Sequence, residues 1–171
     1  MLLLTNKDFR EFVELLNSSG VRFLIVGGHA VALHGYPHFT GDLDVWIATD
    51  AENAVRVEKV LSDFGFGSLK FSAKDFVRPG YAIQLGRPPY RIDILTSIDA
   101  VTFSRAYRRR RTVRAGTLTI PFIALEDLLK NKQATGRAQD LADVERLRSV
   151  NKRRSVKTRR RKRALGNSGE Q

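Results

Sequence analysis

The stretch GGHAVALHGYPHFTGDLDVW, residues 27–46, predicts how the first half of the chain folds. The run before it, VRFLIV (21–26), has the length and continuous hydrophobicity of a buried strand. The glycine pair ends that run, a short helical segment over 29–33 follows, and a second strand is expected over 42–47. The stretch therefore predicts two strands joined by a glycine turn and a short helix.

The second strand carries two acidic residues, Asp42 and Asp44. Side chains alternate along a strand, so both carboxylates face one side, while Leu43 and Val45 face the other side and can be buried. Two neighbouring carboxylates repel each other, and they stay ionised only with solvent, a cation or a partner of opposite charge. Oxygen ligands of this kind favour Mg²⁺ or Mn²⁺.

The remaining elements alternate between helices and strands. Hydrophobic periodicity and capping residues predict helices over 5–19, 49–65, 102–109, 121–132 and 140–149. Two antiparallel hairpins are expected, one formed by 81–85 and 90–96 and the other over 112–120. These elements predict the α/β (α+β) class, with a mixed β-sheet flanked by helices and a small helical part near the C-terminus.

Composition favours one soluble domain with a charged extension. The chain has 171 residues, 42% of them hydrophobic, and no cysteine, which excludes disulfides and thiolate metal sites and fits a cytoplasmic location. No stretch approaches the about 20 apolar residues of a membrane span. The net charge is +12, and residues 151–163 hold nine Lys or Arg and no acid. We therefore predict a folded domain over 1–150 and a disordered polybasic tail over 151–171.

A third acidic residue, Asp93, lies in the segment YRIDILT. It is flanked by Ile92 and Ile94, which fit a buried face, so Asp93 must point to the opposite face. If its strand lies beside the strand of Asp42 and Asp44, three carboxylates converge. Such a cluster suits a site for two metal ions, and the glycine turn would offer backbone N–H groups to phosphate.

The assembled pattern resembles the nucleotidyltransferase superfamily typified by DNA polymerase beta. It is most similar to the bacterial AbiEii-like nucleotidyltransferases, a group that includes toxins of toxin–antitoxin systems. The resemblance covers roughly residues 20–148. The matching residues are Gly27, Gly28, His34, Gly35, Thr40, Asp42, Asp44, Asp93 and the stretch NKQATGRAQDLADVERL (131–147).

The resemblance implies roles for most of these residues. Asp42, Asp44 and Asp93 would be the catalytic residues and the metal ligands, with Mg²⁺ or Mn²⁺ as cofactor. An incoming nucleoside triphosphate would be bound by residues of the turn and of the C-terminal motif, namely Gly27, Gly28, His38, Thr40, Lys132, Arg137 and Asp140.

One position departs from the family pattern. The residue two before Thr40 is commonly Arg or Lys, and here it is His38. A neutral imidazole neutralises phosphate poorly at pH 7, because the ordinary pKa of histidine is near 6.5. Lys132 or Arg137 would have to compensate.

Two functions fit these observations. The first is an enzyme that moves a nucleoside monophosphate from an NTP to an acceptor hydroxyl. The preferred acceptor is RNA, such as tRNA, because the tail and an arginine cluster over 105–114 attract phosphate backbones. The arginine cluster is equally compatible with a solvated helix and edge strand. The second function is a non-catalytic module that binds nucleotide, nucleic acid or a partner protein, such as an antitoxin, without turnover.

Overall fold

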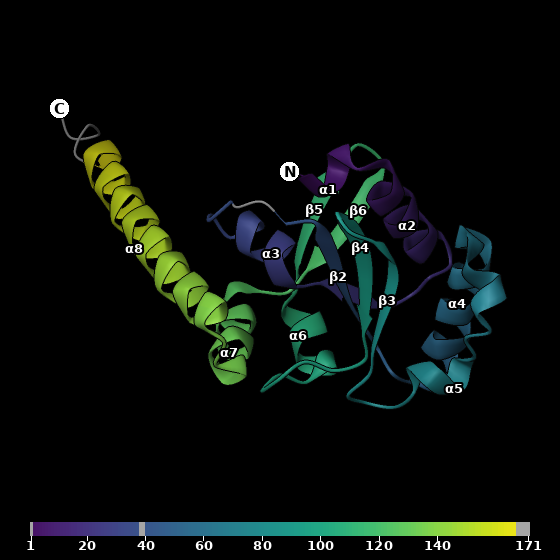
Figure 1. Ribbon diagram of the computed structural model, residues 1–171. Coiled ribbons are helices and arrows are strands. Elements are labelled where there is room, and N and C mark those ends of the chain that lie inside the picture. Colours follow the sequence, from purple (N-terminus) through teal and green to yellow (C-terminus); the bar gives the residue numbers. More distant parts are fainter. Residues whose placement is uncertain (1, 38–39, 167–171) are drawn as a thin grey trace.

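The computed structural model describes residues 2–37 and 40–166, built around one six-stranded mixed sheet (Figure 1). The spatial order of the strands is β3-β4-β2-β1-β6-β5. Parallel pairs join β2 to β4 and β1 to β6, and the remaining neighbours are antiparallel. The strands are β1 (Phe23–Ile25), β2 (Asp42–Ile47), β3 (Ala82–Arg87), β4 (Tyr90–Leu95), β5 (Arg111–Ala115) and β6 (Leu118–Phe122).

Helices connect and flank these strands, as the α/β prediction requires. They are α1 (Leu2–Thr5), α2 (Lys7–Ser18), α3 (Gly27–Leu33), α4 (Ala51–Leu61), α5 (Ala73–Phe76), α6 (Phe103–Arg109), α7 (Leu125–Thr135) and α8 (Ala138–Gly166), with a π-helical turn at Ser62–Phe66 and a 3₁₀ turn at Gly67–Leu69. The mixed sheet and both hairpins are confirmed. No helix of the described part of the chain is long and apolar enough to cross a membrane.

Two predicted helix starts are wrong. The first long helix begins after Asn6, whose side chain accepts a hydrogen bond from the Phe9 backbone N–H, so Thr5 belongs to a separate short helix. Pro121 does not start a helix, because it lies within β6 among the buried residues Ile120 and Phe122. Burial of this apolar segment in the sheet outweighs the preference of proline for a helix start.

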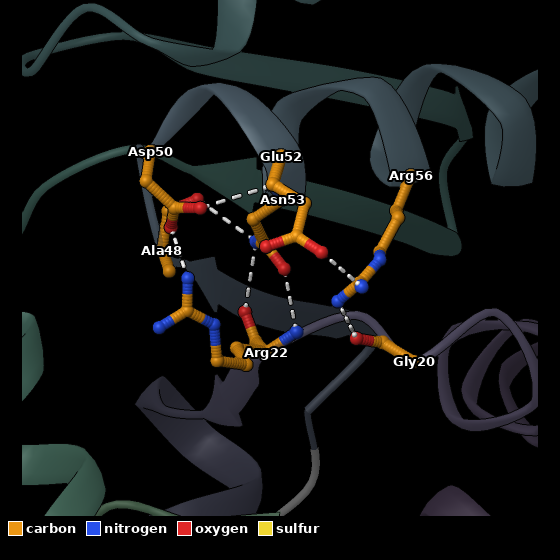
Figure 2. A network of polar contacts seen from close by, with 7 residues as sticks. All are labelled: Gly20, Arg22, Ala48, Asp50, Glu52, Asn53 and Arg56. Carbon is orange, nitrogen blue, oxygen red and sulfur yellow. Dashed lines mark hydrogen bonds and ion pairs between the residues drawn. The ribbon is translucent and has the colours of Figure 1, made fainter.

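The start of α4, which the sequence places at Thr49, is organised by a polar network (Figure 2). Asp50, not Thr49, caps the helix by accepting the Asn53 backbone N–H. The buried Asn53 side chain accepts the Arg22 backbone N–H at 2.7 Å and donates to the carbonyl oxygens of Arg22 and Ala48 at 3.1 and 2.8 Å. The amide thus joins the start of α4 to the chain just before β1 and just after β2 (Figure 2).

The central strand β2 has two faces with different neighbours. Leu43, Val45 and Ile47 are fully buried and belong to the apolar core. On the opposite face, Trp46 is also buried and packs edge-on against Phe103 of α6, with ring centroids 5.1 Å apart. That second face therefore has an apolar end at Trp46 and an acidic end at Asp42 and Asp44.

Helix α8 continues through the basic segment that the sequence predicts to be disordered. It runs to Gly166 and projects beyond α7, away from the sheet (Figure 1). Lysine and arginine are good helix formers, and a helix already nucleated in the folded domain propagates more easily than an isolated one. Residues 167–171 lie outside the described part of the chain, and the domain boundary at residue 150 stays a prediction.

Candidate active site

The parallel pairing of β2 and β4 brings the predicted acidic residues onto neighbouring strands. Asp44 and Asp93 are directly opposite in the register, and Asp42 is opposite Arg91. The apolar residues between them, such as Leu43 opposite Ile92, are buried in the core and fix this alignment. The strand arrangement on which the acidic cluster depends is therefore present.

Asp44 lies against the glycine turn that ends β1. Its carboxylate accepts a hydrogen bond from the Gly28 backbone N–H at the start of α3. Gly27 has a left-handed φ of 58°, and a Cβ atom there would overlap Oδ2 of Asp44. Gly28 is equally confined, because a Cβ atom there would lie 2.8 Å from Thr40 Oγ1. Gly27 is thus required by both backbone conformation and space, and Gly28 by space alone.

Electrostatics favour a cation beside Asp44. Its pKa is raised to about 6, chiefly by burial and then by the charges of Asp93 and Asp42, while Lys132 and the Gly28 hydrogen bond oppose the shift. A carboxylate whose pKa is raised by its neighbours is stabilised in its ionised form when a positive charge enters the site.

Asp93 is buried and incompletely hydrogen-bonded. Gln84 of β3 lies 3.4 Å from Oδ2, whereas Oδ1 has no hydrogen-bond partner among the described residues. Burial raises the pKa of Asp93, and the nearby Arg91 counters part of that increase. An unsatisfied buried carboxylate oxygen is expensive unless a ligand or ion completes it.

Arg91 is the main residue of the site that the sequence analysis did not identify. Its Nε and Nη2 donate to the two carboxylate oxygens of Asp42 at 3.1 and 2.7 Å, and Nη2 lies 3.9 Å from Asp93 Oδ2. The strand alternation that placed Asp93 also places Arg91, two residues earlier, on the same face. Strand alternation could therefore have identified Arg91 as a residue of the site from the sequence.

A second polar cluster joins α7 to α8. Lys132 Nζ lies 2.5 Å from Asp140 Oδ1 and 2.9 Å from Asp143 Oδ2, and all three side chains are buried. Thr135 and Arg137 donate to the other oxygen of Asp140. Burial alone raises the pKa of Asp140, but the hydrogen bonds from Lys132, Thr135 and Arg137 outweigh it and lower the pKa overall.

Both clusters line one cleft of about 600 Å³. Among the described residues, every residue for which the sequence analysis predicted a site role contributes to it: Gly27, Gly28, Thr40, Asp42, Asp44, Asp93, Lys132, Arg137 and Asp140. His38, also predicted, lies outside the described residues. The cleft is also lined by residues for which the sequence predicts no role, including Gln84, Arg91, Asn131, Thr135 and Asp143.

A hollow of similar size lies elsewhere and does not suit the same chemistry. It has a volume of about 690 Å³ and lies between α2 and the turn after α4. Three of its acidic residues, Glu11, Glu14 and Asp63, already pair with Lys or Arg one helical turn away. We therefore place the candidate active site in the cleft of β2 and β4.

The donor set in this cleft suits Mg²⁺ in its chemistry but not in its present arrangement. Three carboxylates, among them Asp93 with its unsatisfied Oδ1, match a hard divalent cation. Among the described residues, however, no three His, Asp or Glu side chains are arranged as a metal-binding group. The three predicted carboxylates line one cleft, but Asp42 is turned toward Arg91, and their role as metal ligands stays a prediction.

Comparison with known proteins identifies the family. Residues 5–167 match a family profile described as a nucleotidyl transferase of unknown function (DUF2204). The chain belongs to this nucleotidyl transferase family. The match extends across the whole cleft, from the glycine turn to the acidic residues of α8. No curated protein sequence matches the chain.

Solved structures with partial likeness carry related descriptions. A candidate nucleotidyltransferase from Thermotoga maritima is 21% identical, with 86% of this chain and 90% of that chain covered and a TM-score of 0.49. An antigenic nucleotidyltransferase-like protein from Paracoccidioides brasiliensis is 20% identical, with 81% and 72% covered and a TM-score of 0.48.

Proposed function

We propose that this family member is an active, metal-dependent nucleotidyltransferase. The observation that carries the proposal is the pairing of Asp44 with Asp93 on parallel strands, beside the start of α3 and within one polar cleft. Asp42, Asp44 and Asp93 would hold Mg²⁺ or Mn²⁺. When bound, such ions neutralise the triphosphate and stabilise charge on the attacking and leaving oxygens.

The reaction transfers a nucleoside monophosphate. The acceptor hydroxyl oxygen forms a bond to the α-phosphorus, the bond from that phosphorus to the β-phosphate bridging oxygen breaks, and pyrophosphate leaves. The hydroxyl proton passes to a cleft carboxylate, and Asp93 is our candidate because its Oδ1 is unsatisfied. The chain contributes mainly by holding the reactants in line and by its fixed charges.

The C-terminal cluster would bind the phosphates. Lys132 is held by two carboxylates, so its ammonium position is fixed before any ligand enters. Arg137 is largely exposed at the cleft, with its side chain 75% accessible, and makes one ion pair to Asp140. We assign the direct phosphate contact to Arg137, because most of its N–H donors are not used within the chain. Lys132 would attract the phosphates electrostatically without contacting them.

We propose RNA, such as tRNA, as the acceptor. Helix α8 carries the polybasic segment away from the sheet, where it could follow a phosphate backbone (Figure 1). Only some arginines of the cluster over 105–114 are available for an RNA contact. Arg109 is used internally, paired with the buried Asp127, and Arg110 lies over the Tyr107 ring at 4.1 Å. Arg105, Arg108, Arg111 and Arg114 stay exposed.

The closeness to AbiEii-like proteins and a role as the toxin of a toxin–antitoxin pair rest on the sequence resemblance alone. An antitoxin partner is accordingly a prediction, and its test is co-purification of the chain with the product of a neighbouring gene.

One observation favours a non-catalytic module instead. Arg91 engages both oxygens of Asp42, which would otherwise be a metal ligand. A chain that had lost turnover could keep this ion pair and still bind nucleotide or nucleic acid.

A transfer assay separates the two functions. Purified protein with Mg²⁺ or Mn²⁺, each labelled NTP and total RNA is expected to label RNA, and Asp44→Asn is expected to abolish labelling. Asp63→Asn removes the same charge outside the cleft and should leave labelling unchanged. Absence of transfer to RNA, protein or small hydroxyl compounds with any NTP would favour the module.

A further inference from the structure

Arg91 occupies the space between two of the three carboxylates. It donates to both oxygens of Asp42 and lies 3.9 Å from Asp93 Oδ2. The sheet holds the two residues opposite each other, since Arg91 and Asp42 are register partners on β4 and β2. The guanidinium therefore provides, from within the chain, the positive charge that this acidic pair requires.

This contact conflicts with metal binding at Asp42. Each oxygen of Asp42 already accepts one hydrogen bond from Arg91, so a divalent cation there would compete with the guanidinium for the same carboxylate. The two cations would also repel each other at this separation. Titration cannot resolve the conflict, because the hydrogen bonds and charge of Asp42, with the charge of Asp93, raise the pKa of Arg91 further above its usual range. Movement of the Arg91 side chain, rather than loss of its proton, would therefore free both oxygens of Asp42.

We propose that Arg91 is a displaceable counter-ion of the metal site, which gives up Asp42 when a divalent cation enters together with a triphosphate and then binds a phosphate oxygen. The inference rests on the proposed function, because it takes Asp42, Asp44 and Asp93 as metal ligands. It adds a nucleotide-binding residue that the sequence analysis did not identify.

The surroundings of Arg91 favour phosphate as its second partner. Its side chain is 30% exposed, and it opens into the same cleft as Gly28, Lys132 and Arg137. The planar guanidinium offers paired donors that match phosphate as well as carboxylate geometry. The triphosphate thus supplies a new partner for Arg91 while the metal ion takes its former one, which couples the two binding events.

Mn²⁺ binding in the absence and presence of a non-hydrolysable NTP tests this coupling. Mn²⁺ affinity can be measured by electron paramagnetic resonance on the full chain, without any turnover. The variants are Arg91→Gln, Arg91→Lys, Asp44→Asn and the control Arg22→Gln, which removes an equal charge paired with Asp50 outside the cleft. Thermal melting of each variant verifies that it is folded.

The expected result is a changed pattern of affinities. Arg91→Gln should bind Mn²⁺ alone at least about 5-fold more tightly than the wild type, and should lose most of the increase in affinity that the NTP analogue gives the wild type. Arg91→Lys should be intermediate, because it keeps the charge but not the paired donors. Arg22→Gln should match the wild type.

Two results would overturn the inference, and they can be told apart. If Arg91→Gln binds Mn²⁺ no more tightly than the wild type while Asp44→Asn loses binding, the metal site stands and the role of Arg91 is wrong. If neither the wild type nor any variant binds Mn²⁺ even with the NTP analogue, both the proposed metal site and the inference are wrong.

Discussion

Substitution of Gly27 by alanine tests how the glycine turn shapes the site. The change adds one methyl group, and its effect has two separable parts. The first is conformational, because Gly27 has a φ of 58°, where a residue with a Cβ atom costs roughly 1–2 kcal/mol. The second is steric, because the new Cβ atom would overlap Oδ2 of Asp44.

Gly116 supplies a matched control. It has nearly the same φ, 63°, in the turn between β5 and β6, and a Cβ atom there would meet nothing within 4 Å. Gly116→Ala should therefore lower the free energy of unfolding by the conformational cost alone, about 1–2 kcal/mol. The difference between the two variants isolates the collision with Asp44.

We expect Gly27→Ala to affect the site more than the fold. The new Cβ atom would also lie 2.6 Å from Cγ of Asp44, so the whole side chain must shift, which adds a loss of stability of about 1–3 kcal/mol beyond the control. That shift breaks the Gly28 hydrogen bond and moves a predicted metal ligand, so Mn²⁺ affinity should fall about tenfold or more, as for other disturbed ligand supports. Urea unfolding and Mn²⁺ titration measure the two effects. Gly27→Ala with the stability of Gly116→Ala and unchanged Mn²⁺ affinity would refute this account of the turn.

Three further predictions concern stability, pH and nucleic-acid binding. Asn53→Ala should lower the free energy of unfolding by about 2–4 kcal/mol in urea titrations, because it leaves buried backbone groups unpaired. A loss below about 1 kcal/mol would contradict the role of this amide. Since the pKa of Asp44 rises from 3.8 to about 6 on folding, the metal-free protein binds more protons than the unfolded chain between these pH values, and its free energy of unfolding should fall as pH rises through that window. Asp44→Asn should flatten this pH profile and be up to about 3 kcal/mol more stable than the metal-free wild type at pH 7, and an equally steep profile in the variant would show that another group titrates. Removal of residues 151–171 should weaken RNA binding about tenfold or more at physiological salt and reduce its salt dependence without changing Mn²⁺ affinity; unchanged RNA affinity would exclude the segment as an RNA contact.

Strand alternation was enough to place the acidic residues. The residues flanking Asp44 and Asp93 are apolar, so only one orientation of each strand buries them, and the register that aligns Leu43 with Ile92 also aligns the two carboxylates. Strands β2 and β4 are far apart in the chain, but they pair in this register because it buries the apolar residues of both strands. The sequence therefore predicts which residues share a strand face when the residues of the opposite face are all apolar.

Partners within a face were harder to predict. Alternation places Arg91 on the face of Asp93, yet it does not say whether the guanidinium turns to Asp42, to solvent or to a ligand. The start of the helix near Pro121 was missed for a related reason, because local preference was overruled by burial of Ile120 and Phe122 in the sheet. Both errors concern interactions between segments far apart in the chain.

The distribution of charge in the cleft argues for a function that involves added cations. In the described part of the cleft, Asp42 pairs with Arg91, and Asp140 and Asp143 share Lys132. Asp44 and Asp93 face each other across β2 and β4 without an equally close cation of their own, since the nearest ion pair of Asp93 is the 3.9 Å approach of Arg91. A fold selected only for stability would replace such a pair by apolar residues, because unpaired buried carboxylates are costly. Their presence in a chain of net charge +12 supports the proposal that a positive ligand enters from outside.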